Sequence, residues 1–414
     1  MSAVAGLLSL GGAASNDLVG EFQETILVRN ARGFNVGTTL VGLMSRLESE
    51  PAENSEFSWF ERDPVRRQIY ADGADATAPT AQNEADTIIV QETSTTGTAV
   101  DAWQHLAVGH VLRNDRTGEY VQVTATPTSG TVSVLRAIDT AVSATLATYT
   151  INDNDPWVIV TLGQAEGANP TQASYEGPSA LTNYIQTFNS TVELTNAFKG
   201  NKLRSDAAGP LDDRRITALE KIAYDIELAY FFGVKKVTGT TGVRTYYTGG
   251  VKNAVDTNVS ANALDAGGTA GIPMKDFRDW LRAPMTSGSD VKLALCGPTA
   301  YSAFSDYANQ AVNGFRITQA ESVFGMNITT VQTPFGLLDL AMHPLFTQTP
   351  SLQDWMFVLD LAHIKQKIME PLFLEPNIQT PGQDSYKEQY RAKLGLKLKF
   401  ANAFGYAANL QQII

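Results

Sequence analysis

The strongest constraint on this chain is one long stretch of helical periodicity between Pro210 and Gly233. Pro210 suits the first turn of a helix, and Asp212 and Asp213 would complement the positive end of its dipole. Gly233 would close the helix in the left-handed conformation. At about 1.5 Å per residue the predicted helix is roughly 35 Å long, which is enough to brace a flat, elongated subunit. Its predicted buried face is formed by apolar residues at three- and four-residue steps, namely Ile216, Leu219, Ile222, Ala223, Ile226 and Ala229.

The length of 414 residues corresponds, as a soft prior, to two or three domains with ample apolar material for their cores. Charged residues make up only 18% of the chain, which suits extensive contacts between subunits. The single cysteine, Cys296, cannot form an internal disulfide and is expected to be a buried small hydrophobe. The N-terminus lacks the basic start of a secretory signal, and no apolar run reaches membrane-spanning length. We therefore expect synthesis in the cytoplasm and no membrane partner.

Charge is unevenly distributed along the chain. Residues 1–198 contain no lysine, and their nine arginines against 23 acids give a net charge of −14. Residues 199–414 carry 22 basic and 20 acidic residues, a net charge of +2. No long basic stripe with interleaved aromatics is present, so direct sequence-specific DNA binding is not expected.

The N-terminal part divides by composition. Residues 1–32 are small, polar and weakly periodic, which predicts an arm that is ordered only against a neighbour. A short helix is predicted over 38–47. Residues 50–85 are rich in Asp, Glu, Ala, Pro and Gly and carry an aromatic-acidic patch at 57–63, which predicts an extended, projecting excursion.

A β-rich segment follows from 87 to 163, where short β-branched runs alternate with turn residues. This pattern predicts a small antiparallel sandwich or barrel, inserted into the chain. The predicted strands cover 87–93, 109–113, 119–125, 131–136 and 157–163, with hairpin loops at 114–118 and 127–130.

The remainder of the chain mixes helices and strands, so the fold class is α+β. The chain is expected to return from the insertion through 182–195 into the long helix. Further predicted elements are a helix at 274–281, a strand at 291–296, a helix opening at Pro298, and strands near 326–331, 355–361 and 393–400.

Catalytic and metal-binding patterns are weak throughout. His105 and His110 lie five residues apart, which is the wrong register for a helical metal pair. The carboxylate-dense segment 152–156 lacks the glycine and distal glutamate of an EF-hand, so a turn is favoured over a calcium loop. The glycine-rich segment 267–271 lacks the lysine of a phosphate-binding loop. We therefore expect no enzyme activity, no catalytic or metal site and no cofactor.

Several separated segments, taken in order, carry a resemblance to a known family. They are 57–59 (Phe-Ser-Trp), 118–124, 183–195, 219–227, Thr248-Gly249-Gly250, 358–361 and 382–386. In their order and spacing the chain resembles the major capsid proteins of tailed phages (Caudoviricetes) with the Hong Kong 97-like fold, in the group with a β domain inserted in the extension loop. The likeness spans about 38–410. It departs at 393–399, where that pattern leads one to expect a glutamate-led segment but this chain is lysine-rich, so the partner contacts of this strand are expected to differ.

The resemblance implies a division of the chain into five parts. These are an N-terminal arm and short helix (1–49), an extension loop (50–200) containing the inserted β domain at about 87–165, a peripheral domain (201–253) with the spine helix at 211–233, an axial domain (254–350), and return strands of the peripheral domain (351–414).

It also implies a function. Identical subunits would form pentamers and hexamers that tile an icosahedral or prolate shell around double-stranded DNA, in a virion assembled in the host cytoplasm. Portal, scaffold and decoration proteins are the further partners such a shell would have. The projecting loop suggests Trp59, Phe60, Arg62, Arg66 and Arg67 as candidate inter-subunit contacts, because aromatic and arginine side chains often anchor interfaces; a locally packed loop with solvated arginines is the alternative.

The type member of this family joins a lysine of the extension loop to an asparagine of a neighbour, but no lysine precedes Lys199 here. We therefore expect a noncovalent shell. Two other functions remain open at this point: an encapsulin-like cargo shell of the same fold, and a secreted β-rich adhesin or carbohydrate-binding protein.

Overall fold

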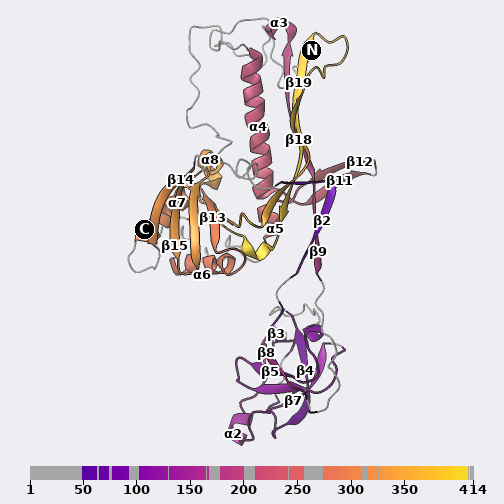
Figure 1. Cartoon of the computed structure of the whole chain (residues 1–414), viewed down its shortest axis with the longest axis vertical. Coiled ribbons are helices and arrows are strands. Elements are labelled where there is room, and N and C mark those ends of the chain that lie inside the picture. The colour runs from indigo at the N-terminus through magenta and orange to yellow at the C-terminus, as the bar shows by residue number, and fades with distance from the viewer. Residues whose placement is uncertain are drawn as a thin grey trace. The chain divides into compact units, whose positions relative to one another are not determined.

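The computed structural model describes residues 49–62, 65–73, 77–92, 102–128, 130–164, 166, 178–199, 210–240, 242–255, 274–309, 316–323, 326–408 and 410. The expected arm (1–32), the short helix (38–47) and the glycine-rich segment 267–271 lie outside these residues. The chain forms two compact units, Phe60–Ala180 and the combination of Met1–Trp59 with Leu181–Ile414. Helices and sheets both contribute, as the α+β prediction required (Figure 1).

The Phe60–Ala180 unit is built around a closed six-stranded antiparallel barrel. Its strands, in the order β3-β4-β7-β6-β5-β8, are β3 (Gln68–Ala71), β4 (Glu84–Gln91), β7 (Thr131–Arg136), β6 (Tyr120–Val123), β5 (His110–Asn114) and β8 (Pro156–Leu162). The five predicted strands are confirmed. The prediction that all of 50–85 is an extended excursion is wrong, because β3 and the start of β4 close the barrel; four residues of β3 are too few to show a period. Two short helices, η3 (Ala102–His105) and α2 (Ser143–Leu146), belong to the same unit.

Inward-facing residues fill the barrel by the alternation expected of strands. Ile69, Leu112, Val121 and Val132 are completely buried, as is the large ring of Trp157. This apolar centre makes the unit a packed core with no room for a channel.

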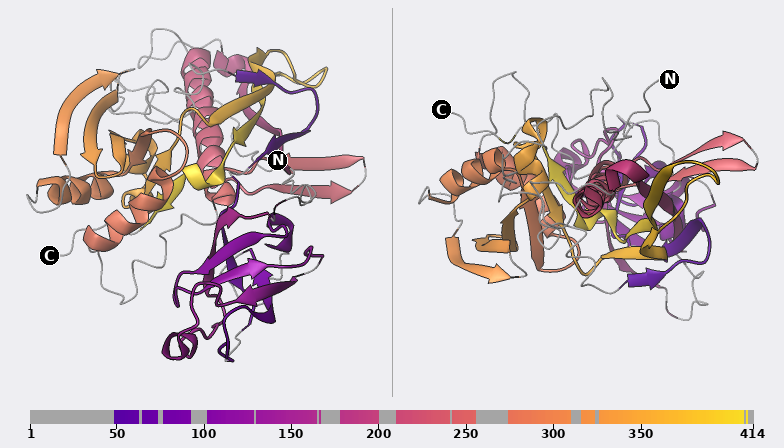
Figure 2. Two further views of the ribbon diagram at one scale, coloured as in Figure 1. Left: turned by 60° about the horizontal axis from the view of Figure 1, so that its bottom comes forward. Right: turned by 90° about the horizontal axis from the view of Figure 1, so that it is seen from above.

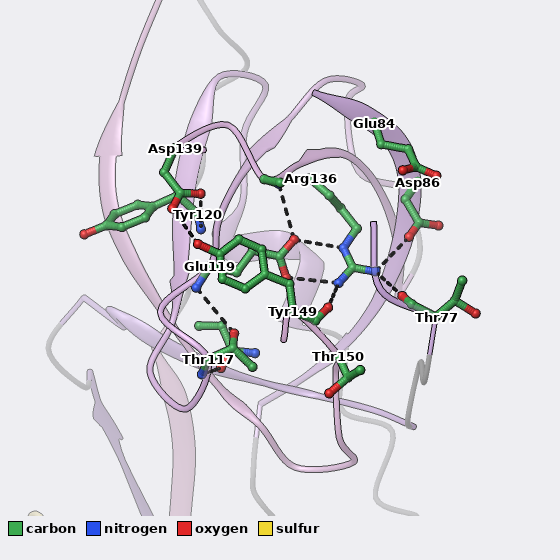
Figure 3. Close-up of polar contacts among 12 residues, drawn as sticks. Thr77, Glu84, Asp86, Thr117, Glu119, Tyr120, Arg136, Asp139, Tyr149 and Thr150 are labelled. Carbon is green, nitrogen blue, oxygen red and sulfur yellow. Dashed lines mark hydrogen bonds and ion pairs between the residues drawn. The ribbon is translucent and has the colours of Figure 1, made fainter. Parts of the chain in front are cut away.

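A buried charge pair joins the end of β7 to the residue that precedes β6 (Figure 3). Arg136 at the end of β7 donates from Nε and Nη2 to the two carboxylate oxygens of Glu119, at 2.9 and 3.0 Å. Its other donors reach the carbonyl oxygens of Thr77 and Tyr149 and the carboxylate of Asp86. Burial raises the pKa of Glu119, and the bonds from Arg136 oppose that rise. The pair is therefore stabilised by a full set of hydrogen bonds, which a buried ion pair requires.

The long helix of the second unit, α4, runs from Pro210 to Phe232, as predicted. Its buried face differs from the predicted one: Ile216 and Leu219 are 46% and 37% exposed. The residues that do face the core are Ala218, Ile222, Ala223, Ile226, Tyr230 and Phe231. The apolar residues of α4 spread around more than one face, so periodicity located the helix but misplaced part of its contact surface.

Beside α4 lies a four-stranded sheet in the order β1-β18-β19-β10. The strands are β1 (Ser49–Pro51), β18 (Ile364–Glu375), β19 (Ser385–Leu398) and β10 (Gln186–Thr195). The predicted strand at 393–400 is the end of the longer β19, and β10 is most of the predicted return at 182–195. Arg215 of α4 donates from Nε and Nη2 to Glu388 of β19 at 2.7 and 2.8 Å. Burial alone would raise the pKa of Glu388, but the bonds from Arg215 and Tyr386 together outweigh it, and the pKa lies below its usual range.

A six-stranded mixed sheet is the second large sheet of this unit, in the order β14-β15-β16-β13-β17-β20. Its strands are β14 (Arg316–Val323), β15 (Met326–Thr333), β16 (Gly336–Met342), β13 (Val291–Cys296), β17 (Met356–Leu359) and β20 (Gly405–Ala407). Helices α6 (Met274–Met285) and α7 (Pro298–Asn309) accompany it, and the shorter helices are α3 (Asn196–Lys199), α5 (Val251–Ala254), α8 (Pro344–Gln348), η4 (Pro350–Leu352) and η5 (Ala401–Ala403). The strands predicted at 291–296, 326–331 and 355–361 are confirmed.

The central strand β13 is buried on both faces of this sheet. Leu293 and Leu295 join the core that contains α4, whereas Ala294 and Cys296 join the core formed with α6 and α7. This explains why β13 reads as an almost continuous apolar run instead of an alternating one.

Candidate assembly surfaces

Two of the predicted contact residues, Trp59 and Phe60, lie on a two-stranded ribbon. It is formed by β2 (Glu56–Glu61) and β9 (Ser179–Tyr184). Along β2 exposed and half-buried residues alternate, so Glu56, Ser58 and Phe60 face outward. The rings of Phe57 and Trp59 are stacked, with centroids 5.9 Å apart.

The five predicted contact residues do not share one environment. Phe60 is 70% exposed, and Arg62 and Arg67 are exposed as well. Arg66 is half-buried and donates to the carbonyl oxygen of Glu92 at 2.7 Å. Trp59 belongs to one compact unit and the other four to the second. Their role in contacts between subunits stays a prediction, and for Arg66 the local bond offers a sufficient structural reason.

A tight junction at the foot of α4 was not predicted as a site. Asn183 is buried and donates from Nδ2 to the carbonyl oxygens of Gly249 and Leu396, at 3.0 and 2.7 Å. Its Oδ1 accepts from the Gly249 N–H at 2.8 Å. Gly250 N–H then donates to the carbonyl oxygen of Gly233 at 2.9 Å. One side chain and three glycines thus join α4, β9 and β19.

Gly233 does not have the left-handed conformation that the sequence predicted, since its φ is not positive. It is glycine because of close approach. A Cβ there would lie 2.5 Å from the carbonyl oxygen of Thr248, and closer still to that of Ala229. The helix therefore ends where the backbone at 248–250 crosses it, with no room for a side chain.

From this junction projects a β-hairpin of β11 (Lys236–Thr240) and β12 (Val243–Tyr247), seen at the edge of its unit in Figures 1 and 2. Its two strands form a sheet of their own. Val243, next to the turn, is 77% exposed, and Lys236 and Tyr247, which pair with each other at the base of the hairpin, are exposed as well. Tyr246 turns inward, with its ring 5.6 Å from that of Tyr184. A two-stranded hairpin is only marginally stable alone in water, so a partner bound to this exposed surface would stabilise it.

A pocket of about 380 Å³ lies at the root of the hairpin. It is lined by Ser55, Ile185, Gln186, Thr187, Arg244, Thr245, Tyr246, Tyr247, Met369 and Lys393. Arg244 has no ion-pair partner among the described residues, whereas Lys393 binds Glu370 at 2.7 Å. The pocket therefore contains the guanidinium of Arg244, unpaired within the described ranges, beside the rings of Tyr246 and Tyr247.

The edge strand β1 is held by charge. Glu50 accepts ion pairs from Lys367 and Lys397 at 2.9 Å and from Lys365 at 3.3 Å. Lys365 and Lys397 are direct cross-strand neighbours on β18 and β19. Like charges in that position repel each other. The Glu50 carboxylate therefore offsets the repulsion between the two lysines and also anchors β1. Lys397 and Lys367 hold the pKa of Glu50 at about 2.

The described residues include no group of three or more potential metal ligands. His105 Nε2 lies 2.8 Å from Glu92, and His110 Nδ1 accepts from the Ala107 N–H. The segment 152–156 is the predicted turn, with Asn154 at φ +66° and Asp155 bound to Arg116 at 2.7 Å. Burial raises the pKa of the Cys296 thiol to about 12, which makes it a poor nucleophile.

The helices within the described ranges include none with the length and apolarity needed to cross a membrane.

The hairpin is the surface that sequence reasoning missed, although a signal was present. Residues 236–247 combine Val, Thr and Tyr with two glycines at the turn, which is typical of a short hairpin. The junction at Asn183 could not be found in this way, because it joins residues more than sixty positions apart.

A family model described as "SU10 major capsid protein" matches residues 34–411. A search among curated proteins finds no match. Among solved structures the chain is similar to one of Microbacterium phage Oxtober96, with 9% identity, a TM-score of 0.41 and 91% of each chain covered. It is similar as well to a chain in the cyanophage A-1(L) capsid asymmetric unit, with 12% identity, a TM-score of 0.41, and 61% of this chain and 85% of that chain covered.

A third similar structure is the holo-SrpI encapsulin complex from Synechococcus elongatus PCC 7942, with 11% identity, a TM-score of 0.39, and 57% of this chain and 77% of that chain covered. TM-scores this low do not identify the protein, whereas the family model covers most of the chain. The chain therefore belongs to the SU10 major capsid protein family, and it is a structural protein of a phage head shell.

Proposed function

We propose that this chain self-assembles into pentamers and hexamers that close an icosahedral or prolate head shell around double-stranded DNA. The observation that carries the proposal is the family match over residues 34–411. Rings and closed shells arise when identical subunits meet through heterologous contacts, which need two different surfaces on each subunit. The exposed apolar residues Phe60 and Val243 lie on separate elements and suit such contacts.

The subunit is then organised as a Hong Kong 97-like capsid fold. In this proposal α4 is the spine helix of the peripheral domain (201–253), residues 254–350 are the axial domain, and 351–414 return to the peripheral domain. Residues 1–49 are the N-terminal arm and 50–200 the extension loop, with the barrel inserted at about 87–165. Support comes from family membership together with the long helix and the closed barrel.

The shell acts by contact and not by catalysis. The buried thiol of Cys296 and the protein-bonded His105 and His110 have structural surroundings. The strongly acidic first 198 residues would contain the genome without binding its sequence, since packed DNA is neutralised mainly by small cations. Assembly in the host cytoplasm, with portal, scaffold and decoration proteins, completes the proposal.

The test is the mass of the purified protein, expressed alone and together with its neighbouring genes. Light scattering should give megadalton particles, against 44.7 kDa for one subunit. A monomer or small dimer under both conditions contradicts the proposal. An encapsulin-like shell, the weaker alternative, would carry a protein cargo and no DNA, so nuclease-protected DNA in native particles separates the two.

A further inference from the structure

The β11–β12 hairpin is fixed at its base and exposed along its strands. Its root is fixed by the junction at Asn183 and Gly250, and the Lys235 N–H donates to Asn253 Oδ1 at 3.1 Å. On strand β12, Val243 and Tyr247 are exposed to solvent. A surface that is already held in place loses little entropy when it binds, which favours docking.

The charge of the hairpin limits what it can dock with. Residues 234–247 contain Lys235, Lys236 and Arg244 and no acid. Lys236 and Arg244 have no ion-pair partner within the described part of the chain. Two such hairpins would repel each other, and lysine on an edge strand is a known way to prevent self-pairing. The favoured partner is therefore an acidic surface that is not another hairpin.

The same chain carries a surface of this kind on its barrel unit. Residues 60–180 hold fifteen acids against six arginines and no lysine. The turn at 152–156 gathers acids at one end of the barrel: Gly73 N–H donates to Asp153 at 2.9 Å, and Asp115 N–H donates to the carbonyl oxygen of Pro156 at 2.9 Å.

Not all of this acidity is neutralised locally. Asp155 is paired with Arg116, but the Asp115 side chain is 58% exposed, and its one ion pair among the described residues is with Arg113, at 3.5 Å. Asp72, beside Gly73, has no ion pair within the described residues. We call Asp72, Asp115 and Asp153 the acidic barrel end.

We propose that the β11–β12 hairpin of one subunit docks onto the acidic barrel end of a neighbouring copy in the shell, with Lys236 facing its carboxylates and Arg244 reaching them from the opposite face of the hairpin. This inference rests on the proposed function, because it needs the assembled shell. Complementary charges fix the register of a contact and exclude wrong pairings. The exposed Val243 and Tyr247 lie on the same face of the hairpin as Lys236 and add apolar area to the contact.

Charge reversal tests the contact. The variants K236E/R244E, on the hairpin, and D72K/D115K, on the barrel, should each raise the critical concentration for assembly by about tenfold or more, since like charges then face each other. The four substitutions combined should restore assembly to within about threefold of wild type. K221E/R282E makes the same charge change at two exposed cations elsewhere and should assemble normally. Circular dichroism and the melting temperature show whether each variant folds. If K236E/R244E misfolds, the neutral variant K236Q/R244Q replaces it, and its assembly defect should be smaller than that expected for charge reversal.

The outcomes separate the contact from its alternatives. Failure of each double variant with rescue by the combination supports the proposal. Normal assembly of K236E/R244E overturns it, as does a defect that the combination does not rescue. Shells that form normally but retain less DNA overturn it in favour of a nucleic-acid contact. If the wild-type protein itself does not assemble, the proposed function fails and the inference fails with it. If the wild type and the charge-reversal variants all assemble normally, the proposed function stands and only this contact is ruled out.

Discussion

At the residue scale, stability depends on charges that are buried with their partners. Lys292 and Asp360 are both fully buried, 2.8 Å apart, and Lys292 also donates to the carbonyl oxygens of Ser287 and Ala403. Burial would raise the pKa of Asp360, but the bonds from Lys292 and Ser289 outweigh it and hold the pKa well below its usual range. Such a pair stabilises the fold only while both members are present.

The substitution Asp360→Asn should therefore lower the free energy of unfolding by about 3–5 kcal/mol, because it leaves the Lys292 ammonium buried without a counter-charge. Urea denaturation at neutral pH measures the change. The double variant K292M/D360L should cost less than D360N, since no unpaired charge remains. A D360N variant as stable as wild type would contradict this account of the pair.

The Glu50 cluster predicts a pH dependence. The pKa of Glu50 is lowered from 4.5 to about 2 by Lys397, Lys367 and Lys365, so its contribution to stability is complete above pH 4.5 and is lost as the pH falls toward 2. Glu50→Gln should cost about 1–2 kcal/mol at neutral pH. The difference between wild type and E50Q should shrink toward zero between pH 4.5 and pH 2.

The exposed Glu53 supplies the control, because E53Q should match wild type throughout. A difference for E50Q that is constant with pH would show that the charge of Glu50 is not what anchors β1.

At the element scale, the junction below α4 predicts an intolerance of side chains. Gly233→Ala should lower the free energy of unfolding by about 1–3 kcal/mol, because the new methyl group would meet the backbone at Thr248 and Ala229. Gly130 is the matched control, since a Cβ there has only an ordinary contact of 3.7 Å with the carbonyl oxygen of Val90. Equal melting temperatures for G233A and G130A would rule out the crowded junction.

Elements with local signals could be predicted from the sequence, and those that depend on distant partners could not. The start, periodicity and end of α4 are local, so its bounds were predicted to within a residue. Its buried face was not, because exposure of Ile216 and Leu219 depends on where the sheets lie. Strand β3 is four residues long and is recognisable only through its pairing with β4 and β8.

The same limit applied to the candidate site. Trp59, Phe60, Arg62, Arg66 and Arg67 were chosen by residue type, which cannot reveal that Arg66 is bonded to Glu92 in its own chain. The hairpin at 236–247 was overlooked because its side chains look ordinary. What distinguishes it is that β11 and β12 pair with no other strand in the part of the chain that the structure describes, which is a property of the fold.

At the scale of the whole molecule, the absence of lysine before Lys199 predicts a noncovalent shell. Assembled particles boiled in sodium dodecyl sulfate should run as a single band at the subunit mass of 44.7 kDa. Noncovalent contacts do not survive that treatment, whereas isopeptide bonds do. A ladder of covalent oligomers under reducing conditions would contradict the prediction.

The most direct test of the central claim is cryo-electron microscopy of particles formed by the wild-type chain, alone and with its neighbouring genes. The particles should be closed shells built of fivefold and sixfold rings, with one copy of α4 and one barrel in every subunit. Monomers, or open aggregates without fivefold and sixfold rings, under both conditions would contradict it.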